Sequence, residues 1–136
     1  MKFNEARKII EALNKAEKQI NDFATIAGDE AVNFYTQNFR KQGFDDNGVE
    51  KWKPRKRERL RDAGRALLVK SGALRRSLIR RRAGKLAVYI ISPLPYAERQ
   101  NKGGGGIEAR PIVGESRKLN RNILRILDKR IQNSFR

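Results

Sequence analysis

The 136-residue sequence contains no cysteine and no histidine. These absences exclude a disulfide framework, thiolate or imidazole metal sites, Cys or Ser–His nucleophile systems and histidine acid/base catalysis. Only carboxylates remain for such chemistry, and the run from Asp45 to Gly48 lacks the ligand spacing of a calcium loop. A metal-dependent nuclease would need several converging carboxylates. We therefore expect no enzymatic activity, no catalytic residues, no metal, no cofactor and no small-molecule substrate. The carboxylates considered are Asp45, Asp46, Glu98 and Glu108.

Long hydrophobic runs are also missing. The longest uninterrupted apolar stretch covers residues 86–91, which is too short for a membrane span or the core of a signal peptide. We expect a protein that acts in the cytoplasm of the cell producing it, without membrane contact.

Positive charge is abundant and unevenly distributed. There are 32 Lys and Arg against 15 Asp and Glu, a formal net charge of +17. Residues 1–50 carry 7 basic and 9 acidic side chains, net −2; residues 51–82 carry 14 and 2, net +12; residues 83–136 carry 11 and 4, net +7. The hydrophobic fraction of 38% falls in periodic blocks, which is typical of a folded chain. The length predicts a single domain, 1–136.

The periodicity of apolar residues predicts an α+β fold. Residues 1–42 are helical, and Asn21-Asp22 favours two helices, although one helix with a kink at Gly28 is the alternative. Residues 43–66 form a basic exposed loop. Residues 67–115 form a small antiparallel sheet, with a hairpin at about 77–92, added strands at 67–70 and 107–113, and a glycine-rich loop. Residues 116–136 form a C-terminal helix, capped by Ser116, that packs on the sheet.

A basic segment and one further arginine are the candidates for assembly or anion contact. The segment either binds phosphates, with a strong dependence on salt, or docks on an acidic neighbour. Arg110 is suited to pair with a carboxylate, within the chain or across a subunit boundary. The residues are Lys53, Arg55, Lys56, Arg57, Arg59, Arg61 and Arg110.

Four consecutive glycines, Gly103, Gly104, Gly105 and Gly106, follow Lys102. They lack the Lys-Ser/Thr pair of a P-loop and the spacing of a dinucleotide fingerprint. We interpret them as a flexible loop that becomes ordered against a partner during assembly. Trp52 and Tyr96 have large rings, and we expect both to anchor loops to the core.

Four separated segments resemble, in order, motifs of the phage virion morphogenesis family, the tail completion proteins of Mu-like and P2-like contractile-tailed phages. The matching features are Trp52 and Pro54, then Ser-Gly and Leu-Arg, then Tyr-Ala before a glycine, then Ala-Arg-Pro. The segments are GFDDNGVEKWKP at 43–54, LLVKSGALRRS at 67–77, PYAERQNKGG at 95–104 and ARPIVG at 109–114. Gln100 replaces the family's usual histidine, and Glu108 and Ile112 its usual proline and phenylalanine.

The resemblance implies a structural protein of virion morphogenesis, from a free phage or a prophage. Its role would be tail completion or head–tail joining. It would form an oligomeric ring, contact other tail or connector proteins, and pass from the host cytoplasm into the virion at the head–tail junction or tail terminus. Non-specific contact with DNA would accompany such a position. The alternative function is a basic nucleic-acid-binding accessory protein that uses residues 51–82.

Overall fold

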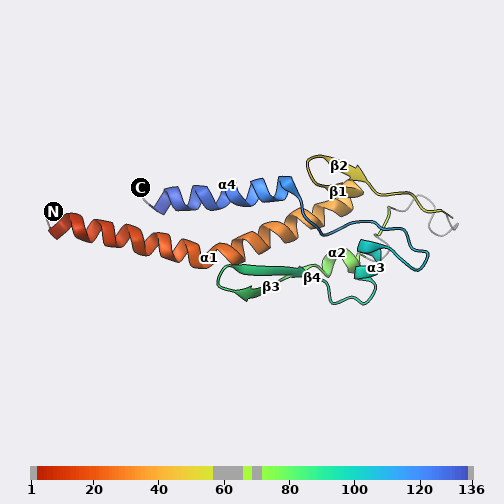
Figure 1. Ribbon diagram of the computed structural model, residues 1–136, viewed down its shortest axis with the longest axis horizontal. Coiled ribbons are helices and arrows are strands. Elements are labelled where there is room, and N and C mark those ends of the chain that lie inside the picture. The colour runs from red at the N-terminus through yellow and green to blue at the C-terminus, as the bar shows by residue number, and fades with distance from the viewer. Residues whose placement is uncertain (1–2, 57–65, 69–71, 135–136) are drawn as a thin grey trace.

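The computed structural model describes residues 3–56, 66–68 and 72–134 and shows an α+β fold. A long central helix carries a second helix along one side and a β-hairpin on the other (Figure 1). The elements in chain order are α1 (Phe3–Lys41), β1 (Gly43–Asp45), β2 (Val49–Lys51), α2 (Ala73–Arg76), β3 (Ile79–Gly84), β4 (Ala87–Ile91), α3 (Ala97–Lys102) and α4 (Arg117–Ser134).

Helix α1 is one continuous helix of 39 residues, so the favoured prediction of two helices is wrong. Asn21, Asp22 and Gly28 all lie inside it. A Cβ atom at Gly28 would come within 2.9 Å of both Arg80 Cδ and Val88 Cγ2. The glycine therefore permits close packing of the β3–β4 hairpin on the helix and does not interrupt the helix.

The predicted hairpin at 77–92 is confirmed as β3 and β4, which pair antiparallel with Arg81 opposite Tyr89. A second hairpin, β1–β2, was not predicted. The added strand predicted at 107–113 is wrong, since its residues join no strand and make only the bridge between Gly104 and Ile107. Of the strand predicted at 67–70, residues 67–68 form a turn and 69–70 lie outside the described residues.

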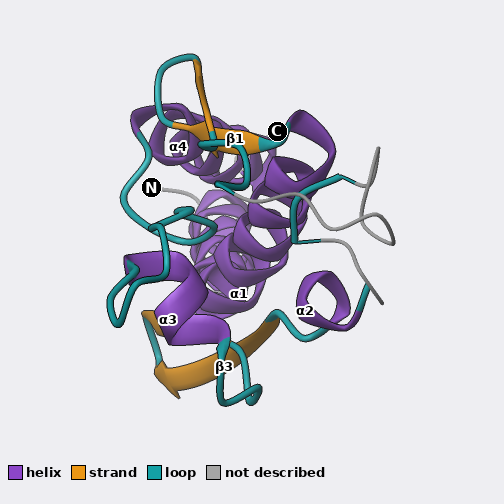
Figure 2. Cartoon of the chain, turned by 90° about the vertical axis from the view of Figure 1, so that its right-hand side faces the viewer, coloured by secondary structure: helices purple, strands orange, loops and turns teal. Residues whose placement is uncertain are grey.

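The core lies around the C-terminal half of α1, where α2, α3, the hairpins and α4 surround one end of that helix (Figure 2). The rings of Phe39 and Trp52 meet edge to face, with centroids 5.8 Å apart. Burial of these aromatic and aliphatic side chains is the main source of stability. The buried cluster is Ala31, Phe34, Tyr35, Phe39, Trp52, Leu74, Leu78, Ile112 and Leu119.

Helix α4 packs antiparallel to α1 and not on a sheet, which corrects the predicted position of the C-terminal helix. Its start is as predicted: Ser116 Oγ accepts a hydrogen bond from the Leu119 backbone N–H at 3.1 Å, as an N-cap residue does. Leu119 enters the core. The apolar stripe of α4 packs on one side of α1, and the β3–β4 hairpin packs on the other side of that helix (Figure 1).

Candidate assembly surface

The segment from Arg110 to Gly114 lies where several distant parts of the chain meet. Its backbone oxygens are bound by side chains of α1 and of the loop after β2. The Trp52 indole donates to Pro111 O at 2.7 Å, the Asn38 amide to Ile112 O at 2.8 Å and the Tyr35 hydroxyl to Gly114 O at 2.5 Å. Burial raises the pKa of Tyr35, and its hydrogen bond to Gly114 opposes that effect only in part. The segment is thereby fixed to the core although it joins no sheet.

Helix α3 holds the backbone N–H groups of the same segment. The side-chain oxygen of Asn101 accepts hydrogen bonds from the backbone N–H of Ile112 at 2.7 Å and of Val113 at 2.9 Å. The Arg110 N–H donates to Gln100 O at 2.9 Å. Each buried backbone group bound in this way avoids the cost of an unmet hydrogen bond.

The start of the second motif is tied to the end of α1. The Gln42 amide donates to Leu67 O at 3.1 Å and accepts from Leu67 N–H at 2.6 Å. Leu74 and Leu78 then enter the same core as Ile112. The four segments 43–54, 67–77, 95–104 and 109–114 therefore meet within one packed unit, as far as their residues are described.

Part of the predicted basic segment is gathered around Glu108. Lys53 Nζ lies 2.9 Å and Lys56 Nζ 4.0 Å from its carboxylate, and Arg110 Nε donates to Lys53 O at 3.0 Å. The hydrogen bond and charge of Lys53 lower the pKa of Glu108, and Glu108 raises the pKa of Lys53 in return. The two lysines are solvent-exposed and Glu108 is partly so, and such pairs contribute little to stability.

The other basic candidates that the structure describes, Arg55 and Arg110, donate hydrogen bonds to backbone oxygens. Arg55 donates to Ala66 O at 3.0 Å across the loop. Arg57, Arg59 and Arg61 lie outside the described residues. For Arg110, the direct hydrogen-bond partner of the guanidinium is a backbone carbonyl of its own chain rather than a carboxylate. Pairing across a subunit boundary stays a prediction.

Two acidic residues, at the end of β1 and in the turn that follows it, bind the start of α4. The sequence did not predict this contact. Asp45 is buried, 2.6 Å from Lys41 Nζ and 3.2 Å from Lys118 Nζ. Burial disfavours the charged form, but the hydrogen bonds and charges of the two lysines outweigh it and lower the pKa of Asp45. Asp46 accepts from the Arg117 backbone N–H at 2.8 Å and pairs with its guanidinium at 2.9 Å. The Arg117 side chain is the main cause of the lowered pKa of Asp46.

The two acidic residues thus have a structural role within the fold. The predicted solvent-exposed loop at 43–66 is wrong in this part, since Gly43, Asp45 and Trp52 are buried, whereas Lys53 and Lys56 are exposed as predicted. Within the described ranges, no group of three acidic side chains is placed to hold a metal ion.

The glycine run forms a tight turn after α3. All four glycines have positive φ angles, from 59° at Gly105 to 115° at Gly104. Gly103 N–H donates to Arg99 O and closes the helix, while Gly104 pairs with Ile107. Side chains at these φ values would be strained, which accounts for glycine here. Ordering against a partner stays a prediction.

The two aromatic anchors have different surroundings. Trp52 is 6% exposed and packs in the core, as predicted. Tyr96 is 45% exposed, so its predicted role as an anchor is wrong. It directly precedes α3, and its backbone carbonyl accepts from Gln100 N–H at 3.1 Å. The neighbouring Ala97 packs against the core in its place.

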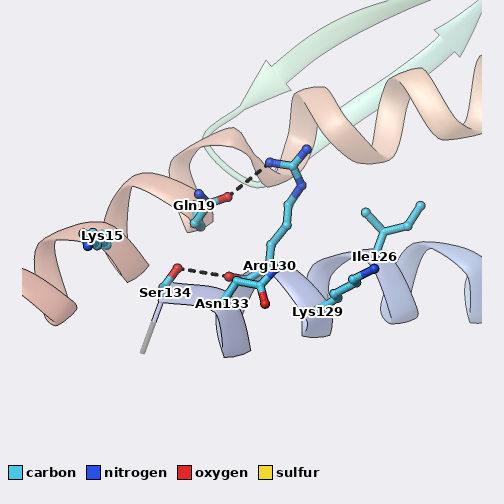
Figure 3. Close-up of a pocket in the computed structure, with 7 residues that line it drawn as sticks. All are labelled: Lys15, Gln19, Ile126, Lys129, Arg130, Asn133 and Ser134. Atoms are coloured by element: carbon cyan, nitrogen blue, oxygen red, sulfur yellow. Dashed lines mark hydrogen bonds between the residues drawn. The ribbon is translucent and has the colours of Figure 1, made fainter. Parts of the chain in front are cut away.

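A groove of about 440 Å³ opens between α1 and α4 near their free ends (Figure 3). Arg130 reaches across it to Gln19 Oε1 at 3.3 Å. Three cations and no carboxylate line it, so the groove suits an anionic group, and no sequence motif pointed to it. The lining residues are Lys15, Gln19, Ile126, Lys129, Arg130, Asn133 and Ser134.

In comparisons with known protein families, with curated proteins and with solved structures, nothing matches this chain. In the part of the chain that the structure describes, no helix combines the length and the hydropathy needed to cross a membrane.

Proposed function

We propose that the protein is a structural component of phage virion morphogenesis, which acts in tail completion or head–tail joining by assembling into an oligomeric ring. It does so through protein–protein contacts and without catalysis. It would assemble in the host cytoplasm and become part of the virion at the head–tail junction or tail terminus.

One observation carries the proposal: the four segments that resemble the family's motifs meet in one unit. Trp52 of the first and Asn101 of the third both bind the backbone of the fourth, at Pro111 and at Ile112. Leu74 of the second packs in the same cluster. Apolar segments of a small domain meet in its core in any case, so the support comes from the specific hydrogen bonds by which the first and third segments hold the backbone of the fourth.

Two arginines of the middle region have partners within the chain, which supports the structural function. Of the three consecutive arginines of β3, Arg80 pairs with Asp29 at 2.6 Å, and Arg82 donates to the backbone oxygen of Asn21 at 2.8 Å. Within the described residues, only Arg81 of the three has no such partner. The carboxylate of Asp29 makes Arg80 less available to phosphates.

Electron microscopy of particles made without this protein tests the proposal. Filled heads beside unattached or unfinished tails are the expected result, with the normal particles restored when the gene is supplied in trans. Normal virions in the absence of the protein would refute the proposed function.

A DNA titration separates the alternative function. Duplex DNA is added to the purified protein at increasing salt, and the same is done with a K53Q/R55Q/K56Q/R57Q variant. Some non-specific binding at low salt follows from the net charge of +17, and we expect it to be weak at physiological salt, where the substitutions should change it little. Tight binding with a steep salt dependence that the variant loses would favour the nucleic-acid-binding function.

A further inference from the structure

The N-terminal part of α1 carries three large apolar side chains that the described part of the chain leaves exposed. We call residues 7–22 the arm. In it, Ile9 is 49% exposed, Ile10 57% and Leu13 56%. Their spacing continues, at three- and four-residue intervals, into Ala24 and Ala31, which are buried in the body of the protein. Ala16 on the same side is also buried, so the core-facing side of α1 is left open at its N-terminal end, at Ile9, Ile10 and Leu13.

An apolar groove of about 460 Å³ opens at the opposite end of the molecule, between β4, α2 and α3. Ile79, the cross-strand partner of Ile91, is 45% exposed and extends this apolar surface. One acidic and one basic side chain, Glu98 and Lys102, are also part of the lining. The apolar lining residues are Leu74, Leu78, Ile90, Ile91, Ile112 and Val113.

The arm cannot reach the groove of its own chain. Both belong to one rigid arrangement around α1, whose 39 residues span about 58 Å at the rise of an α-helix. The free end of the arm and the elements α2 and α3 lie at opposite ends of the long axis (Figure 1). An arm that fills such a groove must therefore come from another molecule.

We propose that the arm of one copy docks, through Ile9, Ile10 and Leu13, in the apolar groove of the next copy. The charge of the arm fits a second copy of this chain. Residues 7–22 contain four basic and three acidic side chains, a net charge of +1 in a chain of +17. This part of the surface meets less repulsion from another strongly basic molecule than the rest of the chain would.

Head-to-tail docking uses both uncovered surfaces of every copy, whereas pairing of two arms would leave each groove open. A head-to-tail contact repeats and closes into a ring when the rotation between copies allows it. The inference rests on the proposed function in this respect, because it names the contact by which the ring would form.

Engineered cysteines provide the test, since the natural chain has none. L13C and I91C proteins are mixed under reducing conditions and then oxidised. We expect disulfide-linked dimers of one L13C and one I91C chain, and a ladder of higher species from the L13C/I91C double variant. L13C mixed with D128C, whose cysteine lies on exposed α4, is the matched control and should give none.

A charge on the apolar side of the arm gives a second readout. L13D should lower the fraction of oligomer in sedimentation velocity at least tenfold, while N14D, with the same charge change at a neighbouring exposed position, should leave it unchanged. Circular dichroism checks that both variants keep the helical content of the parent.

The outcomes are distinct. Dimers of L13C alone would show arm-to-arm pairing and overturn the inference. Oligomers without the L13C–I91C link would overturn it and leave the ring proposal standing, whereas a monomer at every concentration would refute both. If the link forms but particles lacking the protein are normal, the contact stands and the virion function fails.

Discussion

The carboxylate of Asp45 lies 3.2 Å from the ammonium group of Lys118, although 73 residues separate them in the chain. Lys41 at the end of α1 binds the same carboxylate at 2.6 Å. One buried oxygen atom, Asp45 Oδ2, therefore joins α1, the β1–β2 hairpin and the start of α4. The stability of this junction should depend on the charge of Asp45.

D45N should lower the stability of the protein at neutral pH by about 2 kcal/mol, since hydrogen bonds to charged groups contribute about that much. The pKa of Asp45 is lower in the folded state than the ordinary value of about 3.9. Its contribution is therefore present above that pH and is lost as the pH falls through the folded-state pKa. Thermal unfolding from pH 2 to 7 should show a difference between parent and D45N that shrinks in acid.

D22N is the matched control, because Asp22 is exposed on α1. It should unfold like the parent protein at each pH. If D45N and the parent differ by a constant amount across the whole range, the charge of Asp45 is not what stabilises the junction.

Gly28 should not tolerate a branched side chain. A Cβ atom added there would lie 2.9 Å from Val88 Cγ2 and from Arg80 Cδ, and the two γ carbons of valine would extend the overlap. G28V should therefore destabilise the protein by about 1–3 kcal/mol, although glycine itself disfavours a helix interior. Chemical denaturation measures the loss.

N33V provides the comparison, since Asn33 is exposed on the same helix. A loss in G28V no larger than that in N33V would mean that the hairpin moves away from α1 at little cost.

The elements that could be predicted are those whose pattern is local. Ser116 before an apolar stripe marks the start of α4, and two apolar runs around Ala83-Gly84 mark the β3–β4 hairpin. Gly28 shows the limit of this reasoning. The conformational preference of glycine indicates a break in the helix, whereas glycine is needed here because residues of β3 and β4 pack closely against the helix. A close approach between distant segments leaves no local pattern.

The same limit applies to the candidate site. The basic segment and Arg110 were recognisable from composition, but the Glu108 carboxylate that gathers Lys53 and Lys56 was not assigned to them. From the sequence alone, Asp45 and Asp46 are typical residues of a surface turn. Lys41, four residues before Asp45, is a local partner, but Arg117 and Lys118 at the start of α4 lie about seventy residues away, and no spacing rule connects them.

Trp52 should report on the junction between the first and fourth motifs. It is the only tryptophan and is 6% exposed, so its emission should lie at short wavelength in the native protein and shift to the red on unfolding. W52F removes the donor to Pro111 O, a part-buried hydrogen bond, and the loss of this bond should cost about 1 kcal/mol. Native emission typical of a water-exposed indole would contradict the described packing.

Asn101 should matter through its side-chain oxygen. That atom accepts from both the Ile112 and Val113 N–H groups, so N101L leaves two backbone donors unpaired and should cost about 2–4 kcal/mol. N101D keeps an acceptor of the same shape and should retain most of that stability at neutral pH. Urea unfolding of both variants measures the difference. Equal losses in N101L and N101D would mean that side-chain volume at this position matters and the two hydrogen bonds do not.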